Sequence, residues 1–267
     1  MTRPNLGGVP CLAVLVAAMV LFPMRGAWAE MPPGGGRTLV FAILETDQPP
    51  LVTLRDGQVA GGLIKAIGDE IARRTGYRPL YRLLPRNRLE SDLAEGMVDL
   101  ACGYSPDWLP RLPAQRFSIP VFTSRSVLVI RRADAGRLRS LSDLAGRPVG
   151  AVLGFHYPPE VEAAFVDGTW QREDAPSAES NFLKLRNRRV DAILTTDLEV
   201  DYRQATDQGW ADTLATLPQP VGDHEEHCAN AARSPLSMEA LDAAITALQA
   251  DGTLTRLRRD TTGRAGS

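Results

Sequence analysis

A glycine, two hydroxyl-bearing residues and an arginine lie close together in "VDLACGYSPDWLPR", which runs from Val98 to Arg111. The stretch begins with apolar residues that suit a buried strand and then changes to Gly103, Tyr104 and Ser105. A glycine lets a bound group approach the backbone closely, and the N–H groups after it can donate hydrogen bonds. The guanidinium of Arg111 can grip a carboxylate or a phosphate through two parallel hydrogen bonds. This combination indicates an anion-binding site.

An acid at the end of another apolar stretch offers the opposite charge. Asp197 ends "VDAILTTD". A cation and an anion that face each other across a cleft would suit an amino-acid zwitterion. Other candidate residues also follow apolar stretches: Glu45, Phe155, His156 and Tyr157.

Two more arginines, Arg86 and Arg88, precede an expected helix. Together with Arg111 they would favour a more acidic ligand, such as a dicarboxylate. They would equally suit the solvated start of a helix, and Glu45 would equally suit a surface position after a strand. Trp108 is expected to pack against the neighbouring prolines rather than on a ligand.

The elements that would hold these residues alternate between strands and helices. Apolar residues at helical spacing predict a helix from Leu63 to Thr75, which Gly76 ends. Further strands are expected at 38–44, 77–84 and 98–102, with a second helix around 89–97. This order predicts parallel strands with helices packed on the sheet.

A second unit of the same kind follows. Strands are expected at 149–153 and 190–196, with helices at 159–165 and around Phe182 and Leu185. "EGMVDLACGYS" and "NRRVDAILTTD" are similar, which indicates two similar α/β lobes, although Val-Asp before a strand is also common by itself. Ligands bind beyond the carboxyl ends of the strands in open α/β sheets, so the loops of both lobes would line one cleft.

The ends of the chain carry separate signals. Residues 1–29 combine a basic start, an apolar run and an Ala-x-Ala end, which predicts a signal peptide cleaved after Ala29. The alternative is a membrane anchor, but the run is shorter than the roughly 20 residues that a spanning helix needs. Residues 30–37 are expected to be a flexible leader, residues 253–259 a short helix and residues 261–267 a disordered tail.

The net charge, the cysteines and the histidines bear on nucleic-acid binding, disulfide formation and metal binding. The formal charge is −2, and it becomes −4 without Arg3 and Arg25 of the signal peptide, which argues against a nucleic-acid partner. Cys102 and Cys228 could pair in an oxidising compartment or remain two buried thiols. "HEEHC" (224–228) contains metal-ligand residue types, but its spacing is not the H-E-x-x-H pattern, so no metal or other cofactor is expected.

The order of these motifs resembles the periplasmic (extracellular) solute-binding proteins of family 3, the polar amino-acid uptake type. The resemblance covers "DGQVAGGLIKAIGDEIARRTGY", "LAEGMVDLACGYSPDWLPRLPAQRFSIPVF", "LSDLAGRPVGAVLG", "VDAILTTD" and "LDAAITALQADGTLTRLRR". It implies a type II periplasmic-binding-protein fold with two α/β lobes, at 38–130 and 131–225, and a return to the first lobe at 226–260. The two-strand hinge would run through 126–132 and near 227–233.

The resemblance also implies roles for the candidate residues. Arg111, six residues before Phe117, would grip the ligand carboxylate, and Asp197 would receive the α-ammonium. Glu45 would be an acidic residue on the ligand side. The turn 103–105 would cradle the carboxylate, and 155–157 would be the contribution of the second lobe. The sequence departs from the family pattern after Gly62, where an acid is usual, and at Gln48 and Arg86, where aromatic residues are common.

The implied function is capture of a small carboxylate-bearing solute, an amino acid or a related organic anion, in the periplasm. The protein would be a monomer without catalytic residues, and its partner would be an inner-membrane ABC permease. One alternative is a periplasmic enzyme that resembles cyclohexadienyl dehydratases, with Glu45, His156 and Glu173 as candidate acids. Another is a companion or sensor protein that has kept the lobes without transport.

Overall fold

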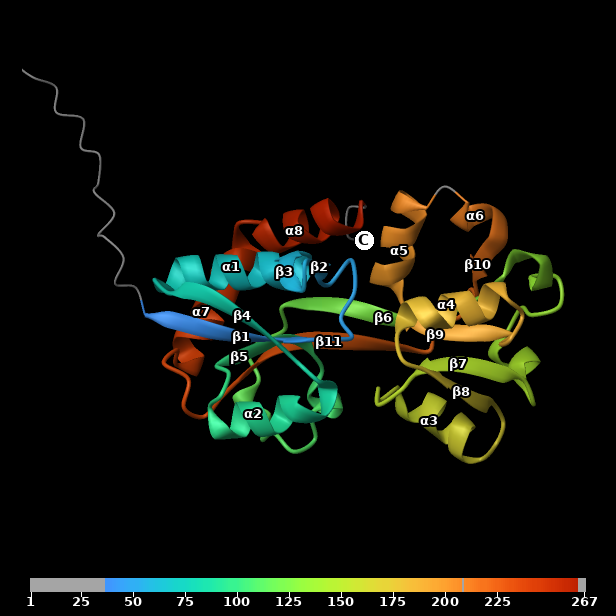
Figure 1. Cartoon of the computed structure of the whole chain (residues 1–267), viewed down its shortest axis with the longest axis horizontal. Coiled ribbons are helices and arrows are strands. Elements are labelled where there is room, and N and C mark those ends of the chain that lie inside the picture. The colour runs from blue at the N-terminus through green and yellow to red at the C-terminus, as the bar shows by residue number, and fades with distance from the viewer. Residues whose placement is uncertain (1–36, 208, 264–267) are drawn as a thin grey trace, which may run out of the picture. The chain divides into compact units, whose positions relative to one another are not determined.

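The computed structural model describes residues 37–207 and 209–263 (Figure 1). The predicted signal peptide, all of the leader except Arg37, and residues 264–267 lie outside the described residues. Within the described part of the chain, no helix is long and apolar enough to cross a membrane.

Three parallel strands form the sheet of the first lobe. Strand β1 (Thr38–Leu44) lies between β4 (Arg78–Leu84) and β5 (Leu100–Tyr104). Alternate residues of β1 point to opposite faces, as the pleat of a strand requires. Leu39, Phe41 and Ile43 enter one apolar cluster, whereas Ala42 and Leu44 enter another. The first lobe therefore buries both faces of its sheet.

Helices cover these two faces. Helix α1 (Leu63–Thr75), α7 (Met238–Ala250) and α8 (Thr253–Thr262) pack on the face of Phe41, and α2 (Leu89–Glu95) covers the opposite face (Figure 1). Helix α1 has the predicted bounds, and Gly76 ends it with a φ of 75°, in the left-handed region that glycine enters at little cost. A hairpin of β2 (Thr53–Arg55) and β3 (Gln58–Gly61) turns at Asp56-Gly57.

The C-terminal helix is longer than predicted. Helix α8 continues to Thr262, so the prediction that disorder begins at residue 261 is wrong for its first two residues. The hydroxyls of Thr261 and Thr262 hydrogen-bond to the carbonyls of Leu257 and Arg258, and the Thr262 side chain is buried.

The second lobe repeats this arrangement. Strand β7 (Pro148–Val152) lies between the parallel strands β8 (Gln171–Ala175) and β9 (Ala192–Thr196). Helix α3 (Pro159–Val166) covers one face of its sheet, and α4 (Ala178–Arg186), α5 (Asp197–Thr206) and α6 (Trp210–Thr213) cover the other. The remaining elements are β10 (Leu214–Thr216) and 3₁₀ turns at 86–88, 106–108, 114–116, 132–134 and 141–144.

Two long strands connect the lobes. Strands β6 (Phe122–Arg131) and β11 (Gly222–Asn230) run antiparallel to each other, with Phe122 opposite Glu226 and Ser126 opposite Gly222 (Figure 1). Beyond this segment β11 pairs with β5 and β6 pairs with β9, which joins both sheets in the order β4-β1-β5-β11-β6-β9-β7-β8.

The strands cross between the lobes a few residues before the predicted hinge positions. The apolar part of β6, Val127–Ile130, is buried in the two clusters of the second lobe. The crossing therefore uses the more polar segments 122–126 and 222–226.

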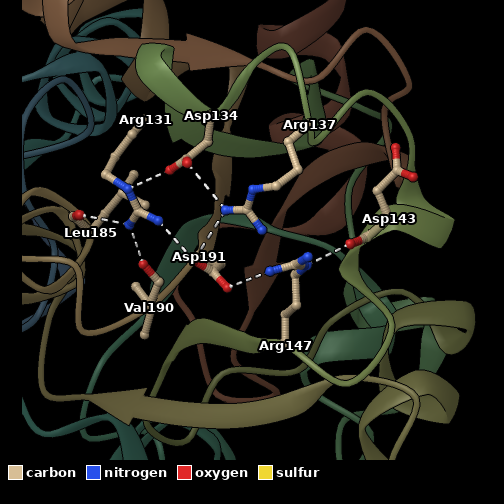
Figure 2. A network of polar contacts seen from close by, with 8 residues as sticks. All are labelled: Arg131, Asp134, Arg137, Asp143, Arg147, Leu185, Val190 and Asp191. Atoms are coloured by element: carbon tan, nitrogen blue, oxygen red, sulfur yellow. Dashed lines mark hydrogen bonds and ion pairs between the residues drawn. The ribbon is translucent and has the colours of Figure 1, made fainter.

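Each lobe is stabilised internally by a different kind of contact. In the first lobe, Cys102 and Cys228 face each other on β5 and β11 and form a disulfide within the apolar core. In the second, Arg131 is 7% exposed and donates to the carbonyls of Leu185 and Val190 (Figure 2). Its guanidinium also forms ion pairs with Asp134 and Asp191, at 2.5 and 2.7 Å.

Candidate functional site

A pocket lies where the strand ends of both lobes meet. The first lobe contributes the loop after β1 and the end of β5, and the second contributes the loop after β7 and the junction of β9 with α5. Strands β6 and β11 contribute Ser126 and Glu226. The charged and polar residues that line the pocket are Thr46, Asp47, Gln48, Arg86, Tyr104, Ser126, His156, Tyr157, Thr195, Thr196, Glu199 and Glu226.

Arg86 and Asp47 form the charged side of the pocket in the first lobe. Arg86 begins the 3₁₀ turn after β4, and its Nη2 donates to the carbonyl of Trp108 at 2.6 Å. Asp47 follows β1, and its Oδ2 accepts a hydrogen bond from the backbone N–H of Leu44 at 2.9 Å. Burial raises the pKa of Asp47 to about 6, against the lowering effects of the Leu44 N–H and the Arg86 charge. Asp47 is therefore mostly ionised at neutral pH.

Glu226 is a buried carboxyl group on β11. Its side chain is 3% exposed, and one oxygen accepts a hydrogen bond from the hydroxyl of Ser124 on β6. Burial raises its pKa to about 8, and the negative charges of Asp197 and Asp47 add to the effect. The Ser124 hydrogen bond and the charge of Arg258 lower the pKa but do not offset burial. At neutral pH, Glu226 therefore holds its proton.

Gly103 leaves room beside this carboxyl group. A Cβ at Gly103 would lie 3.5 Å from Oε2 of Glu226 and 2.7 Å from Cδ1 of Ile64. The residue has a φ of 87°, a conformation that side-chain-bearing residues rarely adopt. A side chain at this position would therefore fill the space beside the Glu226 carboxyl group.

Glu199 is the acid that the second lobe places at the pocket. Its Oε1 lies 2.9 Å from Nη2 of Arg203, one turn along α5, and its Oε2 accepts a hydrogen bond from the Thr195 hydroxyl at 2.6 Å. Burial raises the pKa of Glu199, whereas Arg203 and Thr195 lower it. Its charge is thus matched within the protein.

Six of the ten predicted site residues line the pocket. Arg86, Gly103 and Tyr104 come from the first lobe, and Phe155, His156 and Tyr157 come from the second. The hydroxyl of Tyr157 accepts a hydrogen bond from the N–H of Val152 at 2.8 Å, which fixes the loop after β7. Tyr104 is buried, and desolvation raises the pKa of its hydroxyl well above the usual value.

Arg111 lies outside the pocket, contrary to the sequence-based expectation. Its side chain is 70% exposed, and its Nε lies 3.4 Å from Oε1 of Glu90 on α2. The backbone N–H of Arg111 also donates to Glu90 at 2.8 Å. Leu109, two residues earlier, is fully buried against α2, and this packing carries the following residues toward that helix. Arg86 is the guanidinium that the fold places at the ligand side.

Asp197, Glu45 and Ser105 do not line the pocket either. Asp197 begins α5, where its Oδ1 accepts hydrogen bonds from the N–H groups of Arg125 and Leu198. Its Oδ2 lies 3.3 Å from Nη2 of Arg258 on α8, so the carboxylate ties three elements together. Glu45 is exposed, and Ser105 is buried beside the pocket.

The sequence-based expectation of an acidic ligand required Arg86, Arg88 and Arg111 to lie at one site, and in the structure they do not. Arg88 pairs with Asp92 at 2.9 Å on α2, and Arg111 pairs with Glu90. Only Arg86 lines the pocket. A dicarboxylate would therefore meet one guanidinium and several acids.

Sequence reasoning missed three acids of the pocket and one aromatic residue. Asp47 follows the predicted Glu45 by two residues in the same loop, and Glu199 follows Asp197 by two residues in α5. Glu226 shares the strand face of Cys228, and a cysteine in a strand is a signal for an inward face. Trp108 lines the pocket, with its ring centroid 5.0 Å from that of His224.

The residues of "HEEHC" have separate contacts. His224 hydrogen-bonds through Nε2 to Ser126 at 2.8 Å, His227 contacts the carbonyl of Ser118 at 2.6 Å, and Cys228 is in the disulfide. The described residues contain no group of three or more His, Cys, Asp or Glu that could hold a metal ion. Of the three candidate acids for an enzyme, His156 lines the pocket, whereas Glu45 and Glu173 do not.

Comparison with known proteins agrees with this architecture. Residues 40–263 match the model of the bacterial extracellular solute-binding proteins, family 3. The L-cystine-binding protein TcyJ of Escherichia coli K12 is 26% identical over 260 residues, which cover 96% of this chain and 93% of that protein.

Solved structures of the same fold have lower sequence identity. The GluR0 ligand-binding core from Nostoc punctiforme, in complex with L-glutamate, superposes with a TM-score of 0.67 at 18% identity, over 85% of this chain and 100% of that one. AbpA from Streptococcus pneumoniae, an amino acid ABC transporter substrate-binding protein bound to L-arginine, gives 0.66 at 23% identity, over 85% and 94%. By its sequence match and its two-lobed fold, the chain belongs to the bacterial extracellular solute-binding proteins of family 3.

Proposed function

We propose that this protein captures a small carboxylate-bearing solute, an amino acid, in the periplasm and delivers it to an inner-membrane ABC transporter. The observation that carries the proposal is the charge pattern of the pocket. Arg86 and Asp47, neither of which has an ion pair within 4 Å among the described residues, line a pocket that both lobes share.

The two charges suit the two ends of an amino acid. The guanidinium of Arg86 would bind the carboxylate, because its planar donors match two carboxylate oxygens. The carboxylate of Asp47 would accept hydrogen bonds from the α-ammonium. The apolar residues of the pocket, among them Leu44, Ile64 and Leu194, would exclude water from these contacts.

The connection between the lobes supports capture by closure. Among the described elements, only β6 and β11 run from one core to the other, and a two-strand connection is a typical hinge. A ligand that contacts both lobes would stabilise the closed state, because its contacts are complete only there. The amino-acid ligands of the relatives and the transporter assignment of AbpA support the proposed role.

The proposal is tested by calorimetric titration of Arg86→Ala and Arg111→Ala with the amino acid that binds the wild-type protein. Arg86→Ala should lose at least roughly tenfold in affinity, because a charged hydrogen bond contributes about 1.5–3 kcal/mol. Arg111→Ala is the matched control, since Arg111 is exposed and paired with Glu90. It should bind like the wild-type protein. Unchanged affinity in Arg86→Ala, or a loss confined to Arg111→Ala, would overturn the assignment.

Mass spectrometry of the bound solute provides a second test. The solute should be recovered unchanged after long incubation with the protein. Time-dependent conversion would replace the binding function with the enzymatic one.

A further inference from the structure

The pocket has more acidic groups than one zwitterion needs. Glu199 is matched by Arg203, whereas Asp47, Glu226 and Arg86 have no ion pair within 4 Å in the part of the chain that the structure describes. A zwitterion would use Arg86 and Asp47. Glu226 would remain without a partner of opposite charge.

Negative groups outnumber positive ones around Glu226. The charges of Asp47, in the loop after β1, and of Asp197, at the start of α5, both raise its pKa, and Tyr104 of β5 beside the pocket stays neutral because its own pKa is raised well above the usual value. The nearby cation is Arg258 of α8, whose guanidinium already pairs with Asp197 and donates to the carbonyl of Thr123 at 2.6 Å. Cations of the protein therefore leave the Glu226 carboxyl unmatched.

One oxygen of Glu226 is available to a ligand. Oε1 accepts the hydrogen bond of Ser124, which orients the group from the adjacent strand. Oε2 lies on the side of Gly103, which has no side chain to cover it, and Glu226 lines the pocket. The carboxyl group is thus held in place with one face toward the ligand.

We propose that the ligand is an amino acid with a second cationic group, of the lysine, ornithine and arginine class, and that Glu226 receives this group. The proposal depends on the function proposed above and assigns the side-chain specificity of the same site. The carboxylate of the ligand pairs with Arg86, the α-ammonium with Asp47 and the side-chain cation with Glu226.

The proton of Glu226 makes binding depend on pH. The group is largely protonated at pH 7 in the free protein, and a ligand cation beside it favours the ionised form. Binding therefore releases about one proton to solvent at pH 7. The affinity for a dicationic amino acid should rise roughly tenfold from pH 6.5 to pH 8, because the competing proton is lost over this interval.

The experiment is calorimetric titration of the wild-type protein with L-lysine, L-arginine, L-glutamine and L-glutamate, each in phosphate and in Tris at pH 7. The two buffers differ in ionisation enthalpy, so the difference in heat counts the protons released. L-lysine or L-arginine should bind at least tenfold more tightly than L-glutamine and release about one proton. This measurement needs no variant, so it does not depend on how a substitution folds.

Glu226→Gln adds a second test. The amide keeps the size of the side chain and its contact with Ser124 but cannot ionise. The variant should lose at least tenfold in affinity for the dicationic ligand, release no proton and bind with little dependence on pH. Glu225→Gln, on the exposed face of the same strand, is the matched control and should behave like the wild-type protein.

The outcomes separate this inference from the proposed function. Tight binding of L-glutamine or L-glutamate, with loss of affinity in Arg86→Ala, would keep the proposed function and overturn the role of Glu226. Tight binding of L-lysine with unchanged affinity in Glu226→Gln would also overturn that role. Failure of L-lysine and L-arginine to bind would overturn this inference, whereas unchanged affinity of Arg86→Ala for the bound amino acid would overturn the proposed function itself.

Discussion

The dipeptide Val-Asp directly precedes the third parallel strand of each lobe, and the two lobes use it differently. Val98 and Val190 are both buried. The N–H groups of Asp99 and Asp191 donate to the central strand beside them, to Val40 and Pro148, both at 2.8 Å. The carboxylate of Asp99 accepts a hydrogen bond from the N–H of Val40 at 2.7 Å, whereas that of Asp191 pairs with Arg131. The backbone role is shared, and the side-chain role differs.

This difference extends to how each lobe joins its long strand to its sheet. The first lobe links β11 to β5 through the disulfide between Cys102 and Cys228. The second lobe ties β6 to the loop before β9 through Arg131, with Arg137 and Arg147 around the same carboxylates (Figure 2). Two α/β lobes of the same architecture are therefore stabilised in different ways, one by a covalent bond and the other by a buried charge network.

The largest expected effect follows from removal of the disulfide. The bond joins cysteines 126 residues apart, and a link across a loop of this length restricts the unfolded chain strongly. Cys102→Ser with Cys228→Ser should lower the free energy of unfolding by about 4 kcal/mol. Urea unfolding of the variant and of the reduced wild-type protein should give the same loss. Thiol labelling of the unfolded protein without reductant should add no label to either cysteine, and two labels would contradict the bond.

Removal of Arg131 should cost slightly less. Arg131→Ala leaves the carbonyls of Leu185 and Val190 and the carboxylate of Asp134 without a buried partner. The expected loss is about 3 kcal/mol in the free energy of unfolding. Arg137→Ala is the control, because this side chain is 47% exposed, and it should cost less than about 1 kcal/mol. Equal losses in both variants would show that burial of Arg131 has no special role.

The crossing between the lobes and the second lobe should also respond differently to pH. The pKa of Glu226 is raised by burial, so the folded protein holds a proton that the unfolded chain has lost, and stability falls as the pH rises from about 4.5 to about 8. The Asp134 carboxylate has a lowered pKa, through hydrogen bonds from Arg137 and Arg131 that outweigh desolvation. Its contribution is present above the ordinary pKa of an aspartate and is lost in acid.

Glu226→Gln isolates the contribution of the buried carboxyl group between the lobes. Relative to the wild-type protein, its free energy of unfolding should increase by about 2 kcal/mol between pH 6 and pH 7.5, because the titration of Asp47 is common to both proteins and cancels in the difference. Denaturant unfolding at both pH values measures this change. A constant difference between the two proteins across this interval would show that Glu226 is ionised in the free protein.

The smallest changes in stability are expected from substitutions at two glycines. Comparing these two variants distinguishes an effect on ligand binding from an effect on core packing. A Cβ at Gly103 would approach the end of the Ile64 side chain and Glu226, and one at Gly150 would approach Asn181 and Ile193 in the second lobe. Gly103→Ala and Gly150→Ala should each cost about 1–2 kcal/mol in stability, and Gly103→Ala more than Gly150→Ala because of its φ of 87°. Only Gly103→Ala should also weaken ligand binding, which calorimetry would show. An equal loss of affinity in both variants would contradict this separation.

Much of the fold follows from local sequence patterns. Helix α1 and its end at Gly76 follow from apolar spacing and from the conformational freedom of glycine, and β1 follows from "TLVFAIL". The order of strands and helices predicts parallel sheets, and the repeated Val-Asp pattern predicts two similar lobes, as the structure shows. These features depend on residues near one another in the chain, so one sequence is enough to determine them.

The charges of the pocket could not be predicted in this way. Arg111 has the expected spacing to Phe117, but packing of Leu109 directs the chain to Glu90, and Arg86 lines the pocket. Asp197 follows the correct strand, yet Arg258, 61 residues away, and the N–H of Arg125 take its carboxylate. The sequence by itself determined the elements and the edge of the sheet where a site must lie. Only the tertiary structure decided which charges remain unmatched there and whether Cys102 meets Cys228, because both depend on partners that are distant in the chain.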